Sequence, residues 1–151
     1  MNPIGHFVRD TLGCRCPDEV FRSISIDHLY AADGATPYTR LIVGNRLLIY
    51  VLEAESTSVA RGALADLAAR GCRERDDRDY HRFRLVITCD DREPASAAAR
   101  HAFDQAAGDD QRAHLHCLSR ALLPAEVAPR PPEDVVLATI GVAGRTLGST
   151  R

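Results

Sequence analysis

The alternation of apolar and polar residues predicts a β-hairpin near the middle of the chain. Two apolar runs, YTRLIV and RLLIYVLEA, flank Gly44-Asn45, a pair that suits the tight turn between antiparallel strands. The second run is apolar on both of its faces, which is typical of a strand that is covered on two sides. We therefore expect a hairpin whose second strand lies in the centre of a layered sheet.

After the hairpin, a segment with helical periodicity is followed by a strand-like segment, and this order occurs twice. A Ser-Thr-Ser cap at residues 56–58 precedes a helix expected to stop at Gly71, and Pro94 opens an alanine-rich helix that ends at Gly108. The apolar segments FRLVITC and RAHLHCL follow as strands. Such an order predicts parallel strands with right-handed crossovers. The expected fold class is α/β, a single three-layer domain whose mixed sheet has a parallel βαβαβ centre and an N-terminal antiparallel hairpin.

The two ends of the chain have a less regular pattern. Residues 1–21 are expected to form a helical arm that contains Cys14-Arg15-Cys16, and FRSISID, from Phe21 onward, predicts a further strand. We expect residues 1–123 to form the α/β domain. Residues 124–151 are a proline-rich connector and C-terminal segment, expected to pack on the same domain. Within that segment, residues 133–144 fit a strand or a helix.

The composition is that of a globular protein with little net charge. Hydrophobic residues make up 45% of the 151 residues, charged residues make up 26%, and the net charge is −2 with a pI near 6.3. This charge argues against nucleic acid or a membrane surface as a partner. The N-terminus lacks the features of an export signal, and no apolar run approaches the roughly 20 residues of a membrane span. We therefore expect a cytoplasmic protein.

Five cysteines are the main candidates for chemistry, and in a reducing compartment they are not a disulfide framework. Cys89 and Cys117 end two strands expected to be parallel, so both should emerge at the carboxyl edge of the sheet, where α/β proteins bind ligands. The Cys14/Cys16 pair, folded over that edge, would bring the number of sulfurs to four. Four thiolates can hold zinc or an iron–sulfur cluster. The predicted metal ligands are Cys14, Cys16, Cys89 and Cys117.

These cysteines predict a small thiol-based protein that binds zinc or an iron–sulfur cluster, or that acts as a redox couple through Cys14 and Cys16. The alternative is a non-catalytic interaction or assembly module with structural cysteines, because free cysteine commonly packs as a small apolar residue. That alternative needs no cofactor and implies a protein partner or self-association. The sequence does not decide whether the chain is an enzyme.

Two histidines form a second candidate group. His114 and His116 alternate along one predicted strand, so they share a face opposite to Cys117. Two imidazoles at that spacing can chelate a metal if the face is accessible. A solvated strand surface is the simpler interpretation of the same pattern.

The acidic residues near the strand ends suggest a third interpretation. The segment LVITCDDREPASAAARHAF resembles the aspartate-bearing strand and helix of Toprim-type primase and topoisomerase domains. The resemblance implies magnesium held by Glu53 or Glu55 together with Asp90 and Asp91. It departs from the Toprim pattern in two ways: the aspartates are adjacent instead of Asp-x-Asp, and one intervening strand is missing.

Overall fold

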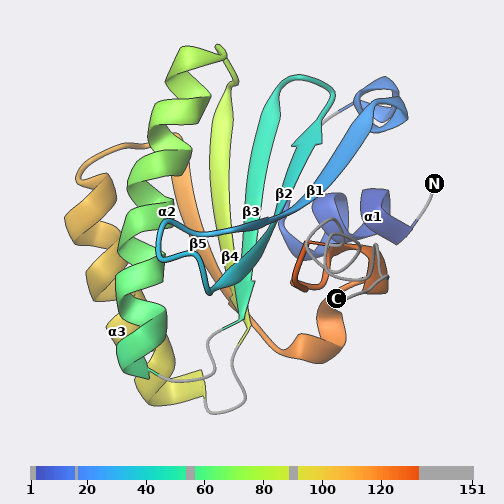
Figure 1. Cartoon of the computed structure of the whole chain (residues 1–151). Helices are drawn as coiled ribbons and strands as arrows, with labels where there is room; N and C mark the ends of the chain where they lie inside the picture. Colours follow the sequence, from blue (N-terminus) through green and yellow to red (C-terminus); the bar gives the residue numbers. More distant parts are fainter. Residues whose placement is uncertain (1–2, 16, 54–56, 89–91, 133–151) are drawn as a thin grey trace, which may run out of the picture.

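The structure is a computed structural model that describes residues 3–15, 17–53, 57–88 and 92–132. Its centre is one five-stranded sheet in the order β1-β2-β3-β4-β5 (Figure 1). The strands are β1 Ile24–Tyr30, β2 Pro37–Val43, β3 Leu47–Glu53, β4 Arg82–Thr88 and β5 Ala113–Leu118. Strands β1 to β3 pair antiparallel, and β3, β4 and β5 pair parallel. The predicted α/β class, with an antiparallel hairpin and a parallel centre, is confirmed.

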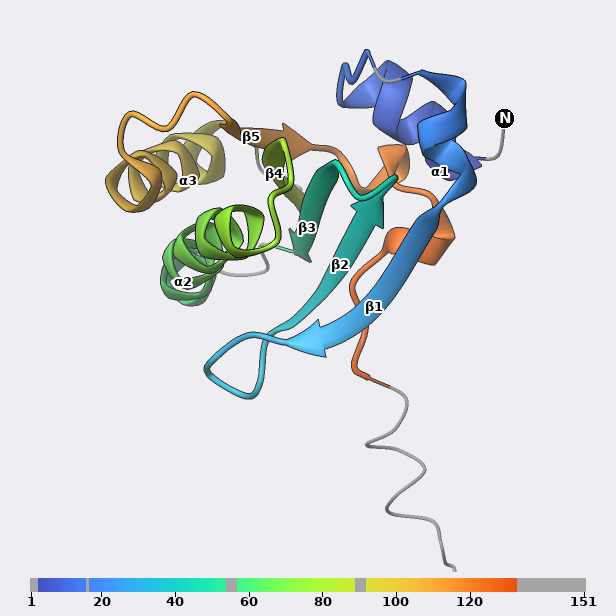
Figure 2. The same ribbon diagram turned by 90° about the horizontal axis from the view of Figure 1, so that it is seen from above.

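Both long helices lie on one face of the sheet (Figure 2). They are α2 Thr57–Asp77 and α3 Arg92–Ala107. Because β3, β4 and β5 follow one another in the same direction across the sheet, two right-handed crossovers place both helices on the same side. We call this the helix face.

The opposite face of the sheet is covered by short elements from the two ends of the described chain (Figure 2). From the N-terminal side come α1 Pro3–His6, the π-helix η1 Phe7–Thr11 and the 3₁₀ helix η2 Asp18–Arg22. From the C-terminal side come the 3₁₀ turns η3 Arg120–Leu122 and η4 Ala125–Val127. We call this the arm face. The strand expected from Phe21 begins instead at Ile24, because the preceding residues form η2.

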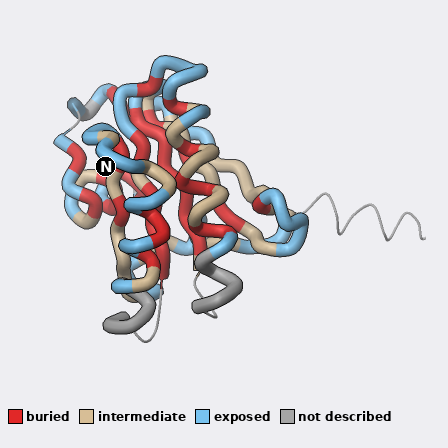
Figure 3. Tube along the Cα trace, turned by 90° about the vertical axis from the view of Figure 1, so that its left-hand side faces the viewer, coloured by how far each residue is buried: buried red, intermediate tan, exposed pale blue. Residues whose placement is uncertain are grey.

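Alternation along the strands divides the core between the two faces. Side chains of β3 and β4 on the helix face pack against α2 and α3; the fully or almost fully buried ones include Leu48, Tyr50, Leu52, Phe83, Leu85 and Ile87. On the arm face a second cluster joins β2 and β3 to the arm, with Phe7, Val8, Leu41, Leu47, Ile49 and Val51 among its members. Figure 3 shows the buried positions concentrated along the strands.

Two glycines determine local features of the fold: Gly44 lies in the turn that was predicted, whereas Gly71 does not end the helix that was expected to stop there. Gly44 and Asn45 both have positive φ angles, 60° and 54°, which is the backbone of the primed turn predicted for the hairpin. The predicted helix stop at Gly71 is wrong, since α2 continues to Asp77. A Cβ at position 71 would overlap the ring of Phe83, so this glycine allows the helix to approach the sheet closely.

The added turns of α2 carry charged residues that bond to the sheet. The Tyr50 hydroxyl donates to Glu74, and Arg40 pairs with Glu74 at 3.3 Å and with Asp27 at 2.9 Å. The mixed run of charges that follows Gly71 would suit a solvated connector, but its first part is instead the end of α2, which is bonded to the sheet.

At the C-terminal side, Leu123 packs against the arm-face cluster and Val127 is fully buried in it. The part of the chain from residue 120 to 132 thus runs over the arm face. The choice between strand and helix for residues 133–144 lies outside the described residues. Among the helices that are described, none combines the length and apolar character needed to cross a membrane.

Candidate anion-binding pocket

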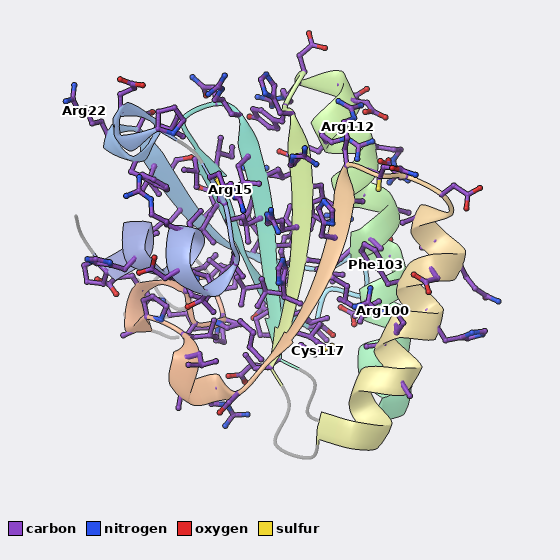
Figure 4. All side chains as sticks on the ribbon, turned by 180° about the vertical axis from the view of Figure 1, so that it is seen from behind. Arg15, Arg22, Arg100, Phe103, Arg112 and Cys117 are labelled. Atoms are coloured by element: carbon purple, nitrogen blue, oxygen red, sulfur yellow. The ribbon has the colours of Figure 1, made fainter. Side chains whose placement is uncertain are left out.

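A pocket of about 240 Å³ lies on the arm face, at the amino ends of β3 and β4. The start of the two strands forms one wall, since Leu47 and Arg82 are partners in the parallel register. The hairpin turn is held against β4 because the backbone N–H of His81 donates to the Arg46 carbonyl at 2.7 Å. The lining residues are Cys14, Arg15, Pro17, Arg46, Leu47, His81, Arg82 and Arg84. Figure 4 shows this side of the molecule, with Arg15 near the upper half of the sheet.

The lining is strongly basic. Four guanidinium groups and one imidazole contribute to it, and no carboxylate does among the residues whose side chains the structure describes, a set that excludes Asp18. The four arginines form no ion pair within the described ranges. Arginines elsewhere do face carboxylates within 4 Å: Arg40, Arg70, Arg75, Arg112 and Arg120. The pocket therefore concentrates positive charge that no described carboxylate side chain pairs with.

Burial, together with this charge, lowers pKa values along β4 and β5. Burial, with the nearby Arg82 charge, lowers the pKa of Arg84 below its ordinary value. Burial and the charges of Arg84 and Arg82 also lower the pKa of His114. For His116, burial together with Arg84, His114 and Arg100 lowers the pKa to about 4. His116 is consequently a neutral imidazole at neutral pH.

Arg84 is the pocket arginine that the protein itself holds in place. Its Nη1 lies 2.9 Å from Nε2 of His116, and a neutral imidazole accepts at its unprotonated nitrogen, so Arg84 donates this hydrogen bond. Its Nε is buried and donates to no acceptor in the part of the chain that the structure describes. A buried donor without an acceptor is unfavourable by about 1–3 kcal/mol.

The structure separates two of the predicted thiol ligands. Cys14 lines the pocket and packs in the arm-face cluster with 8% exposure. Cys117 pairs with Ile87 near the carboxyl end of β5 and packs on the helix face (Figure 4). The two lie on opposite faces and toward opposite ends of the strands. Cys16 and Cys89 lie outside the described residues, so the four-cysteine site stays a prediction, and this placement argues against it.

Other features of the described residues also give no support to a metal centre. No group of three or more His, Cys, Asp or Glu side chains that could hold a metal occurs among them. Cys14 is disulfide-bonded, whereas Cys72 and Cys117 are free. Burial raises the pKa of the Cys72 thiol, against the opposing effect of Arg75, so this thiol is a weak nucleophile at neutral pH.

The acidic residues expected to hold magnesium are described only in part. Glu53, at the end of β3, pairs with Arg120 at 3.4 Å. Glu55, Asp90 and Asp91 lie outside the described residues. No protein-family model, curated protein sequence or solved structure matches the chain.

Sequence reasoning missed this pocket for an identifiable reason. Its arginines come from three segments that are far apart in the chain: the arm, the hairpin turn and the start of β4. One local signal was present, because Arg82 and Arg84 alternate and must share a face once the strand begins at residue 82. The run from Arg70 to Arg84 mixes arginines with acidic residues, and this pattern suggests a solvated segment instead of a basic site.

Proposed function

We propose that this chain is a small binding module that captures a phosphate-type oxyanion at the amino ends of β3 and β4. The observation that carries the proposal is the group of four arginines, Arg15, Arg46, Arg82 and Arg84, that line one pocket without a carboxylate partner in the described chain. Guanidinium groups bind oxyanions through pairs of parallel hydrogen bonds. An anion in the pocket would also offset the mutual repulsion of the four charges.

The size of the pocket favours a small anion or a single charged group. Pockets that enclose a drug-sized ligand have volumes of about 300–1,000 Å³, and this one has about 240 Å³. A phosphate or sulfate, or the phosphorylated end of a small molecule, suits that space. The rest of such a ligand would extend beyond the lining residues.

The charge of the whole chain argues against an extended nucleic acid. The chain has 19 arginines and 21 acidic residues, so the surface outside the four pocket arginines is clearly acidic. Proteins that follow a nucleic-acid backbone generally carry a basic stripe and a high pI. We therefore propose a small phosphorylated ligand, with no nucleic-acid partner.

The thiol-based function remains a separate prediction. Cys14 borders the same pocket, and its sulfur is in a disulfide, which is compatible with the redox version of that prediction. Elemental analysis of the purified protein tests the metal version: zinc or iron at one equivalent would support it, and metal-free folded protein would reject it. Neither result bears on anion binding.

Isothermal titration of the intact protein with sodium phosphate, at constant ionic strength, tests the proposal. We expect saturable binding at one site, and at least ten-fold weaker binding in the double variant Arg46→Gln, Arg82→Gln, because each lost charged hydrogen bond is worth about 1.5–3 kcal/mol. The matched control is Arg73→Gln on α2, an exposed arginine that lines no part of the pocket.

The control variant should bind phosphate within two-fold of the wild type. A short single-stranded oligonucleotide without a terminal phosphate should bind no more tightly than phosphate itself. Absence of saturable binding in the wild type, or equal binding in the double variant, would overturn the proposal. Tighter binding of the oligonucleotide would replace the small ligand with a nucleic acid.

A further inference from the structure

Arg84 differs from the other pocket arginines in the way it is held. Among the side chains that the structure describes, those of Arg15, Arg46 and Arg82 form no hydrogen bond to the protein, whereas Arg84 donates from Nη1 to His116 at 2.9 Å. Arg84 is half-buried on the central part of β4, and its Nε is shielded from solvent. One acceptor therefore determines the direction in which this guanidinium points.

The acceptor is a neutral group. Two other arginines with little exposure, Arg75 and Arg40, are held by carboxylates: Arg75 by Asp110 and Asp76, and Arg40 by Glu74 and Asp27. A carboxylate fixes a guanidinium and also neutralises it. An imidazole that stays unprotonated fixes the guanidinium and leaves its positive charge available to a ligand.

We propose that His116 is a positioning residue that holds the Arg84 guanidinium toward the pocket without neutralising its charge. The inference rests on the proposed function, because it assigns a role within the same anion site. The register of the sheet allows the contact: Arg84 lies opposite His114, and His116 is two residues further along β5 on the same face. His116 does not line the pocket, so it acts through Arg84.

Three substitutions at His116 distinguish two effects on the Arg84 guanidinium: holding it in place and neutralising its charge. In His116→Gln the amide oxygen can still accept from Nη1, so we expect phosphate affinity within about three-fold of the wild type. His116→Leu keeps a similar volume but removes the acceptor, and we expect affinity to fall about five- to twenty-fold. His116→Glu accepts the hydrogen bond and neutralises the charge, so we expect the largest loss, of about fifty-fold or more.

A double-mutant cycle shows whether His116 acts through Arg84. In an Arg84→Gln background, His116→Leu should change the phosphate affinity by less than two-fold, because the group that His116 positions is gone. An equal loss in both backgrounds would overturn the proposal. So would a His116→Glu variant that binds phosphate as tightly as His116→Gln.

A measurement on the ligand-free protein keeps this test independent of the proposed function. We expect the Arg84 Nε–H to give a resolved NMR signal that exchanges slowly with water in the wild type and in His116→Gln, and rapidly in His116→Leu. Equal exchange in all three would reject the positioning role. A wild type that shows the slow signal and binds no phosphate would reject the proposed function and retain the held geometry of Arg84.

Discussion

The helix face and the arm face use the same residue type in opposite ways. On the helix face, Arg40 contacts two carboxylates, and Arg75 pairs with Asp110 at 2.5 Å and with Asp76 at 3.0 Å. On the arm face, the pocket arginines line a cavity from which carboxylates are absent among the described residues. The comparison separates arginines that hold the fold together from arginines available to a ligand.

Burial explains why the two faces differ. Arg75 is 2% exposed, and a buried charge is tolerated when it is paired and hydrogen-bonded. Arg15 and Arg46 are exposed, so water can solvate their charges without a carboxylate from the described residues. Removing a carboxylate on the helix face should therefore destabilise the fold, whereas removing an arginine from the pocket should affect binding and leave the fold almost unchanged.

The largest effect on stability is expected for Asp110→Asn. The substitution removes the strongest partner of the buried Arg75, and we expect the free energy of unfolding to fall by about 2–4 kcal/mol, below the upper end for buried pairs because the Asp110 side chain is 22% exposed. Urea denaturation at pH 7 measures it. The neighbouring exposed Asp109→Asn is the matched control and should change stability by less than about 0.5 kcal/mol.

The same pair predicts a pH dependence. The hydrogen bond from Arg75 holds the pKa of Asp110 below its ordinary value. A carboxylate whose pKa is lowered by folding stabilises the protein above its unfolded pKa, about 4, and loses that contribution as the pH falls through the lower, folded pKa. The difference in unfolding free energy between wild type and Asp110→Asn should therefore shrink below about pH 4. A constant difference down to pH 2 would contradict the pairing.

A smaller effect is expected for Tyr50→Phe, which removes the hydrogen bond from the buried Tyr50 hydroxyl to Glu74. Hydrogen bonds to charged groups contribute about 1.5–3 kcal/mol, and Arg40 still pairs with Glu74 in the variant, so we expect a loss of about 1–2 kcal/mol. Thermal and urea unfolding measure it. Tyr30→Phe, at the end of β1, should be nearly neutral, and an equal loss in both variants would show that the Glu74 contact is not the cause.

The smallest effect on stability is expected for Arg82→Gln in the pocket. The substitution relieves repulsion between like charges, so the unfolding free energy should stay within about 0.5 kcal/mol of the wild type. The pKa of His114 should rise, because Arg82 is one of the charges that lower it. An NMR titration of the histidine measures this shift, with Arg73→Gln as the control. A destabilisation of about 2 kcal/mol would show that Arg82 stabilises the fold. That result would contradict the difference between arginines that hold the helix face together and arginines that are available to a ligand on the arm face.

Local signals account for the parts of the fold that the sequence predicted. Gly44-Asn45 needs no distant partner to favour a primed turn, and the apolar runs of β3 and β4 identify covered strands by themselves. Gly71 shows where a local signal gives the wrong prediction. The same residue type that ends many helices lies inside α2, because the ring of Phe83, twelve residues later, occupies the space of a side chain.

The candidate site depended on information that no local pattern contains. The four-cysteine hypothesis required the arm to fold over the carboxyl edge of the sheet, yet Cys14 lies beside Leu47 and Arg82 at the amino ends of the strands. Nothing in the period of residues 1–21 states which edge the arm covers. The pocket arises from the same tertiary placement, which explains why the arginines were missed although β4, the strand that carries two of them, was predicted.

The central claim is that the unpaired arginines on the arm face form one anion site. An NMR titration of the intact protein with sodium sulfate, which stays a dianion across the useful pH range, tests it most directly. We predict that the side-chain Nε–H signals of Arg46, Arg82 and Arg84 shift together to saturation with a single dissociation constant, while that of Arg73 does not move. Small, linear shifts of equal size at all four arginines would contradict the claim.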